Sequence, residues 1–132
     1  MNNYHFPIQV VAADIDEMGH VNNARYVNWM QDAATAHWVN ITSAQQRSNY
    51  LWVVRRHQID YLRPALMGDA LVCQTWVDNC RGALCTRHYR ITRGEELLLR
   101  AYSQWCMIGN INKQARPMRI PKDIVALFAK AP

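Results

Sequence analysis

The sequence has no apolar run near the roughly eighteen residues that a membrane-spanning helix needs. Its first residues, Met1 to His5, contain neither the basic segment nor the apolar segment of a secretory signal peptide. No C-x-x-C spacing occurs among the four cysteines, so neither a zinc site nor a secreted disulfide framework is predicted. These absences predict a cytoplasmic protein with reduced thiols and without a membrane partner. The cysteines are Cys73, Cys80, Cys85 and Cys106.

The five histidines also lack the spacing of metal ligands, and we expect no bound metal. No serine stands in a nucleophile-elbow motif, which argues against a serine hydrolase. His37 falls among the apolar positions of a predicted helix. A histidine at such a position is more often a hydrogen-bonded core residue than a catalyst.

Lysine is scarce, with three residues against twelve arginines, and the formal net charge is +5. Arginine is suited to bidentate contact with phosphate, so a nucleotide or a phosphorylated carrier is a reasonable partner. The arginines form no dense basic run, however, and a solvated surface explains them equally well. Without a basic stripe or a known motif, we expect no nucleic-acid partner. The spread-out residues are Arg55, Arg63, Arg81, Arg87, Arg90, Arg93 and Arg100.

With 132 residues, half of them apolar, the chain fits one domain over residues 1–132. Apolar positions recur at steps of three and four from Tyr26 to Ile41, which predicts an amphipathic helix over about 23–40. Alternation predicts that Leu97 and Leu99 share one face of the last long strand. The predicted strands are 4–12, 51–62, 70–79, 83–93 and 96–108, with a polar stretch at 42–49 and a terminal helix after Pro121.

The loop from Asp14 to the start of the helix combines acids, a histidine and two asparagines in front of an aromatic helix. A helix N-terminus presents unpaired N–H groups and the positive end of a dipole. The helix terminus can therefore stabilise negative charge that develops on a carbonyl oxygen during a reaction. A carboxylate beside the terminus lies close to that carbonyl group. The alternative is that Asn22 or Asn23 only caps the helix.

This loop is similar to the loop and central helix of the hotdog-fold thioesterases, of both the 4-hydroxybenzoyl-CoA thioesterase type and the plant acyl-ACP thioesterase type. Their motif reads roughly Asp-x-Asp-x-x-x-His-Val-Asn-Asn-x-x-Tyr. Three further blocks fit the same family in order, namely 59–65, 67–71 and 116–121. The resemblance implies an α+β hotdog fold, an antiparallel sheet wrapped around one long central helix. It also implies paired subunits with active sites at their interface.

The resemblance assigns roles to residues of the loop. Asp16 matches the catalytic carboxylate, which acts either as a nucleophile on the thioester carbonyl or as a general base for water. His20 matches a histidine that polarises the carbonyl or positions the water. Gly19 lets a ligand approach the backbone, and Asn22 and Asn23 lie where the family binds substrate, with the N–H near Asn23 as oxyanion donor.

Asp14, the first acid of the motif, is expected to be structural and to accept hydrogen bonds from N–H groups of the loop. Met18 stands where the plant enzymes carry an asparagine, so Asp16 would work mainly with the helix terminus.

The leading hypothesis is a cofactor-independent acyl-CoA thioesterase, with acyl carrier protein as an alternative thioester donor. It would be a homodimer or a dimer of dimers, because a short sheet leaves an edge that can pair. The alternative is a non-catalytic hotdog module that binds an acyl thioester or a protein partner.

Overall fold

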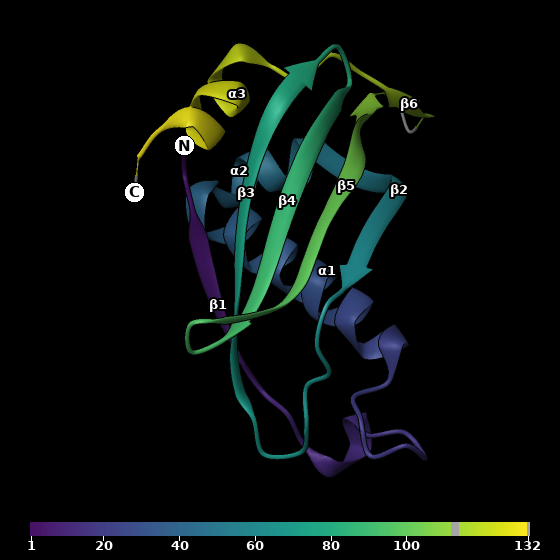
Figure 1. Cartoon of the computed structure of the whole chain (residues 1–132). Helices are drawn as coiled ribbons and strands as arrows, with labels where there is room; N and C mark the ends of the chain where they lie inside the picture. The colour runs from purple at the N-terminus through teal and green to yellow at the C-terminus, as the bar shows by residue number, and fades with distance from the viewer. Residues whose placement is uncertain (112–113, 132) are drawn as a thin grey trace.

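The computed structural model describes residues 1–111 and 114–131, in which one long helix lies across a curled antiparallel sheet (Figure 1). The predicted α+β layout is therefore confirmed. In chain order the elements are β1 (Tyr4–Gln9), the 3₁₀ turn η1 (Ala12–Asp14), α1 (Asn23–Ile41), α2 (Ala44–Asn49), β2 (Tyr50–Tyr61), β3 (Ala70–Arg81), β4 (Leu84–Arg93), β5 (Glu96–Ile111), β6 (Gln114–Pro117) and α3 (Lys122–Ala129).

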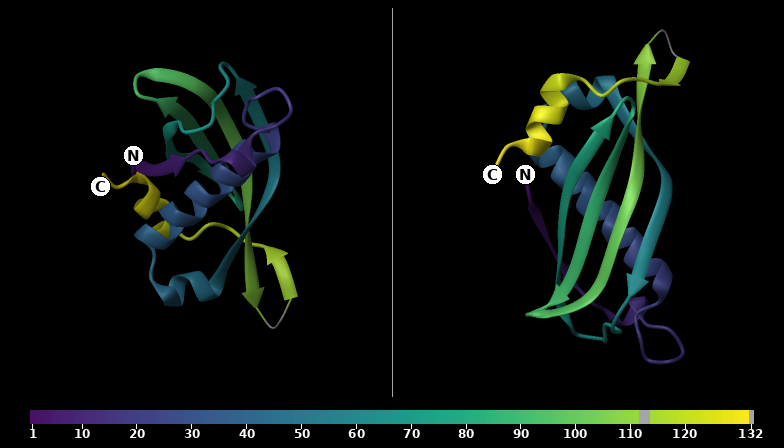
Figure 2. Two further views of the ribbon diagram at one scale, coloured as in Figure 1. Left: turned by 90° about the horizontal axis from the view of Figure 1, so that it is seen from below. Right: turned by 45° about the horizontal axis from the view of Figure 1, so that its top comes forward.

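The sheet has the strand order β1-β3-β4-β5-β2, with β6 paired to β5, and all neighbours are antiparallel. Both views in Figure 2 place α1 against one face of this sheet. The β4–β5 hairpin closes at the pair Arg93 and Glu96, with Gly94 at a positive φ of 58°. Strands β1 and β2 are the two edges.

The core lies between α1 and the inner face of the sheet. The predicted apolar side of α1 is buried, including Trp29, Met30 and Ala33. At the far end of the molecule α3 closes the space with Ile124 and Phe128. The facing strand residues of the main cluster include Leu71, Cys73, Tyr89, Ile91 and Leu99.

Several predicted boundaries were wrong. The first strand ends at Gln9 rather than at residue 12, because the chain then turns into η1. The polar stretch 42–49 contains the helix α2, which starts with a capping box between Ser43 and Gln46. The register of β4 and β5 shifts after Ile91, so that Leu98 is buried and Leu97 only half-buried.

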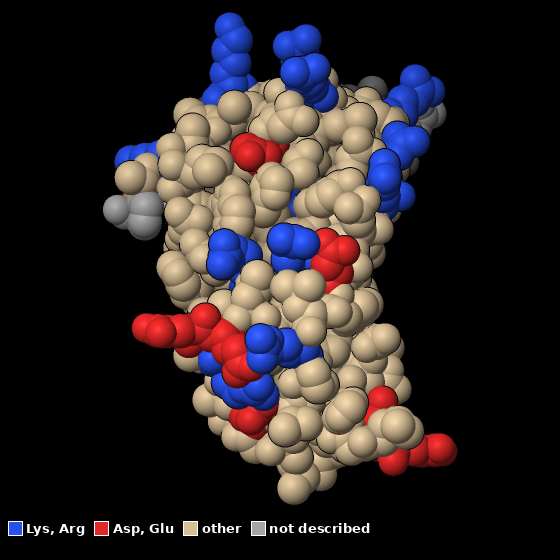
Figure 3. All heavy atoms as spheres, in the orientation of Figure 1, with Lys and Arg blue, Asp and Glu red and all other residues tan. Residues whose placement is uncertain are grey.

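On the face shown in Figure 3, basic side chains near the middle lie beside acidic ones, and further basic side chains stand along the upper end. Arg100 pairs with Asp60, and Arg93 bridges to Asp69 and Glu96. Within the described ranges, no helix combines the length and the apolarity that a membrane crossing requires.

Candidate functional site

The loop before α1 is held by the side chain of Asp14, which is buried. Its Oδ2 accepts a hydrogen bond from the Val11 N–H at 2.9 Å, and its Oδ1 accepts from Arg25 Nε at 2.7 Å. Its backbone carbonyl accepts from the Asn22 N–H at 2.8 Å. Asp14 therefore ties the loop both to the end of β1 and to the first turn of α1, which is the structural role that the sequence predicted.

Asp16 lies at the exposed tip of this loop. Its Oδ1 accepts hydrogen bonds from the N–H groups of Met18 at 2.9 Å and His20 at 3.2 Å. Oδ2 has no hydrogen-bond partner among the described residues. Gly19 makes the turn possible at a φ of 78°, which a residue with a Cβ adopts only under strain. The carboxylate is thus oriented through one oxygen and open to solvent at the other.

The N-terminus of α1 supplies the second half of the site. Asn22 is the N-cap, and its Oδ1 accepts from the Ala24 N–H at 3.0 Å. The Asn23 N–H forms no hydrogen bond with any residue that the structure describes, so a donor at the positive end of the helix stays free. His20 is exposed between Asp16 and the cap. The structure therefore brings the five predicted site residues together in one loop and helix terminus.

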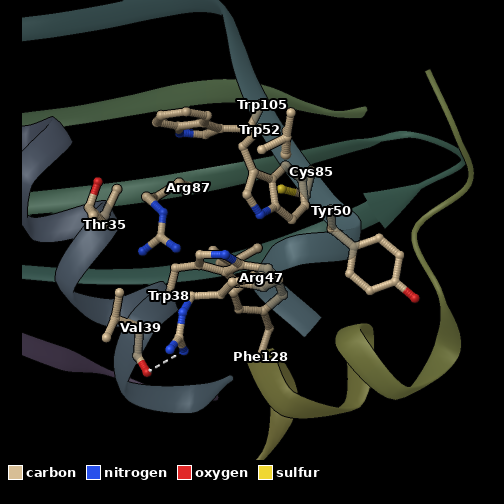
Figure 4. Close-up of a pocket in the computed structure, with 13 residues that line it drawn as sticks. Thr35, Trp38, Val39, Arg47, Tyr50, Trp52, Cys85, Arg87, Trp105 and Phe128 are labelled. Carbon is tan, nitrogen blue, oxygen red and sulfur yellow. Dashed lines mark hydrogen bonds between the residues drawn. The ribbon is translucent and has the colours of Figure 1, made fainter. Parts of the chain in front are cut away.

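A cavity of about 330 Å³ lies at the other end of α1 (Figure 4). Asn23 and Trp38 are separated by about 22 Å along the helix axis, at 1.5 Å per residue. Asp16 and the cavity of the same chain are therefore far apart. The cavity is lined by Ala34, Thr35, Trp38, Val39, Arg47, Tyr50, Leu51, Trp52, Val77, Cys85, Arg87, Trp105 and Phe128.

A buried polar cluster borders this cavity. Arg87 Nη1 donates to His37 Nδ1 at 2.9 Å and to Thr75 Oγ1 at 3.0 Å, and His37 Nε2 donates to Asn2 Oδ1 at 2.8 Å. Burial, together with the Arg87 charge, lowers the pKa of His37 to about 3, so the ring is neutral at physiological pH. The sequence correctly predicted a hydrogen-bonded core role for His37.

Arg87 is the functional candidate that sequence reasoning missed, because it was grouped with the solvated arginines. The structure shows this to be wrong, since Arg87 is only 4% exposed. The signal was present in the alternation of β4, where Arg87 is in phase with Cys85, Tyr89 and Ile91, all of which are buried.

A second polar contact lies on the inner face, next to the free edge of the sheet. His57 Nδ1 and Ser103 Oγ are 2.5 Å apart across β2 and β5. Burial lowers the pKa of His57 below its ordinary value.

Comparison with known proteins gives consistent matches over nearly the whole chain. The family described as thioesterase-like superfamily matches residues 10–128. The acyl-CoA thioesterase YbgC of Haemophilus influenzae is 28% identical over 131 residues, which is 96% of this chain and 95% of that protein. The acyl-CoA thioester hydrolase YbgC of Escherichia coli O157:H7 is 30% identical over 128 residues, 95% of each protein.

Solved structures show the same fold. A probable thioesterase from Bartonella henselae is 26% identical, with a TM-score of 0.76 over 90% of this chain and 98% of that one. A mutant 4-hydroxybenzoyl CoA thioesterase complexed with 4-hydroxybenzoyl CoA has a TM-score of 0.84 over 96% and 98% of the two chains, at 16% identity. These likenesses confirm the predicted hotdog fold.

Proposed function

Because the chain belongs to the thioesterase-like superfamily, we propose that it hydrolyses an acyl-CoA thioester to a carboxylic acid and free coenzyme A, with Asp16 at the reacting centre. The observation that carries the proposal is the carboxylate of Asp16 beside a helix terminus with a free N–H. The two YbgC relatives, which match 96% and 95% of this chain, are named acyl-CoA thioesterase and acyl-CoA thioester hydrolase.

Asp16 has the geometry for either of two routes. With Oδ1 held by the Met18 and His20 N–H groups, Oδ2 is free to attack the thioester carbon and release the thiolate of coenzyme A, which leaves a mixed anhydride for water to hydrolyse. Alternatively, Oδ2 takes a proton from a water molecule that attacks the same carbon. In both routes negative charge develops on the carbonyl oxygen, and the Asn23 N–H is the donor for it. His20 polarises the carbonyl or positions the water.

A second copy of the chain completes the site in this proposal. Strand β2 is a twelve-residue edge strand that leaves Leu51 52% and Val53 48% exposed. A long edge strand with exposed apolar side chains favours pairing with another chain. Antiparallel pairing of two β2 strands around a two-fold axis forms a homodimer, and a dimer of dimers contains the same unit.

This pairing would join the two separated halves of the site. The loop that carries Asp16 lies at the C-terminal end of β2, since the Tyr26 ring packs 5.6 Å from that of Tyr61. The cavity lies at the other end of the strand, where Tyr50 and Trp52 line it. Antiparallel strands place these two ends side by side, so the acyl group would occupy one subunit's cavity while the carbonyl meets the other subunit's Asp16.

The test is release of free thiol over a panel of short, long, branched and aromatic acyl-CoAs, with an acyl carrier protein thioester as a further donor. Asp16→Asn keeps the hydrogen-bonding shape and removes the charge. We expect turnover to fall by about a hundredfold or more in a folded, oligomeric variant. Glu17→Gln removes a charge from an exposed neighbour in the same loop and is the matched control.

Two outcomes would contradict the proposal. If no acyl thioester is hydrolysed but one binds, the chain is a non-catalytic hotdog module. If the folded Asp16→Asn variant hydrolyses the best substrate at nearly the wild-type rate, Asp16 only stabilises the turn of the loop. Detection of an acyl group on Asp16 by mass spectrometry of rapidly quenched enzyme would select the nucleophilic route.

A further inference from the structure

Arg87 is a buried cation without a carboxylate partner. Among the described residues, it donates hydrogen bonds only to His37 and Thr75, both from Nη1, and both acceptors are neutral. The depressed pKa of His37 keeps that ring uncharged. Burial also lowers the pKa of Arg87 itself, as expected for a charge removed from water. A cation in such surroundings favours an anion that can reach it.

The free side of the guanidinium is the side that binds carboxylates best. Within the described residues, Nε and Nη2 have no hydrogen-bond partner, and no fully buried side-chain nitrogen or oxygen lacks one. Nε and Nη2 are therefore reached by solvent, although the residue as a whole is only 4% exposed. Figure 4 shows the guanidinium among the side chains that line the cavity. These two nitrogens form the parallel pair of donors that a carboxylate accepts bidentately.

The rest of the cavity suits an apolar or aromatic acyl group. Aromatic rings dominate the walls, with Trp38 packed edge-on to Trp52 at 5.6 Å and stacked on Phe128 at 6.0 Å. None of the residues that line the cavity is acidic. Arg47, the other cation of the lining, is only half-buried, and its Nη1 donates to the backbone carbonyls of residues 39 and 42. Arg87 is thus the buried cation of the lining.

We propose that Arg87 selects acyl groups that carry a carboxylate at the end remote from the thioester, so that the preferred substrates are monothioesters of dicarboxylic acids. This rests on the proposed function, in which the acyl group occupies the cavity. The terminal carboxylate binds Nε and Nη2 of Arg87, and the aromatic walls contact the intervening chain or ring. An acyl group that ends in a methyl leaves both donors without a partner, which lowers its affinity relative to the carboxylate.

The test compares kcat/KM for pairs of thioesters that differ only at this end: adipoyl-CoA against hexanoyl-CoA, and 4-carboxybenzoyl-CoA against 4-methylbenzoyl-CoA. We expect the wild type to favour the carboxylate in at least one pair by about tenfold or more. Two results with the wild type alone would overturn the proposal. One is a preference for the methyl-terminated thioester in both pairs, and the other is no preference in either pair.

Variants separate selection from packing. Arg87→Met removes the charge at similar volume and is expected to lower the carboxylate preference by about tenfold or more. Arg87→Lys keeps the charge without the planar fork, and an intermediate preference is expected. Arg90→Met changes an exposed arginine of the same strand and should keep the wild-type ratio. A folded Arg87→Met protein with the wild-type ratio would refute the role of Arg87.

Calorimetry with the free acids distinguishes this inference from the proposed function. Adipate should bind the wild type more tightly than hexanoate, and Arg87→Met should lose the difference. If that holds while no thioester is hydrolysed, the proposed function fails and the selection by Arg87 stands. If thioesters are hydrolysed while the wild type prefers hexanoate, in binding and in turnover, the selection fails and the proposed function stands.

Discussion

Acidification between pH 6.5 and pH 5 should destabilise this protein through His37, which is fully buried. Its Nδ1 accepts from Arg87 and its Nε2 donates to Asn2, while Tyr4 stacks on the ring at 5.5 Å. Protonation would place a hydrogen on Nδ1, against the guanidinium 2.9 Å away. The folded protein therefore resists a proton that the unfolded chain takes up readily.

The magnitude follows from the two pKa values. Folding lowers the pKa of His37 from its ordinary 6.5 to about 3. Between these values the unfolded chain binds more protons than the folded chain, so the free energy of unfolding falls as the pH falls. Each pH unit corresponds to about 1.4 kcal/mol, which gives about 2 kcal/mol between pH 6.5 and pH 5. Above pH 6.5 His37 no longer lowers the free energy of unfolding, and below pH 3 its effect stops increasing.

The assay is urea unfolding at a series of pH values and one fixed protein concentration, because association with a second copy would also change stability. His37→Gln cannot titrate, so its stability should vary less with pH than that of the wild type, by about 1.4 kcal/mol per unit in this range. Asn28→Gln, on the exposed face of the same helix, should keep the wild-type slope. Equal slopes for His37→Gln and the wild type would show that His37 accepts a proton freely in the folded state.

The main helix and strands could be predicted because their apolar pattern repeats over many residues. Helix α1 has a buried face that recurs over about three turns, from Tyr26 to His37, and the long strands alternate over ten residues or more. Helix α2 has six residues, none of them buried, so it has no apolar period to detect. Its only signal was the capping box between Ser43 and Gln46.

Of the site, the loop around Asp16 could be predicted from the sequence and the cavity could not. The Asp16 loop is a contiguous segment, so its chemistry could be read from neighbouring residues. The cavity is assembled from segments distant in the chain, such as Thr35, Arg87 and Phe128, and no local pattern joins them. Composition left the place of Arg87 open, whereas its position in the alternation of β4 indicates a buried side chain. The alternation was right because His37 and Thr75 supply the acceptors that a buried guanidinium needs.

Three further changes test the loop and the edge strand. His20→Ala should lower turnover by roughly ten- to a thousandfold, the range for losing one polarising or acid–base group, and an unchanged rate in the thiol-release assay would leave it a structural role. Asp14→Asn should lower the free energy of unfolding by about 2 kcal/mol in urea titrations, since its amide cannot accept from both Val11 and Arg25, and a cost below about 0.5 kcal/mol would contradict this. Replacing Val53, which does not line the cavity, by lysine should raise the monomer fraction in analytical ultracentrifugation and lower turnover in parallel. The reason is that a charge on the exposed edge opposes strand pairing, and an Asp16 loop without a second subunit faces no acyl cavity. A wild-type protein that is monomeric at micromolar concentration and fully active would refute this assembly, because one chain would then bring the thioester to Asp16 unaided.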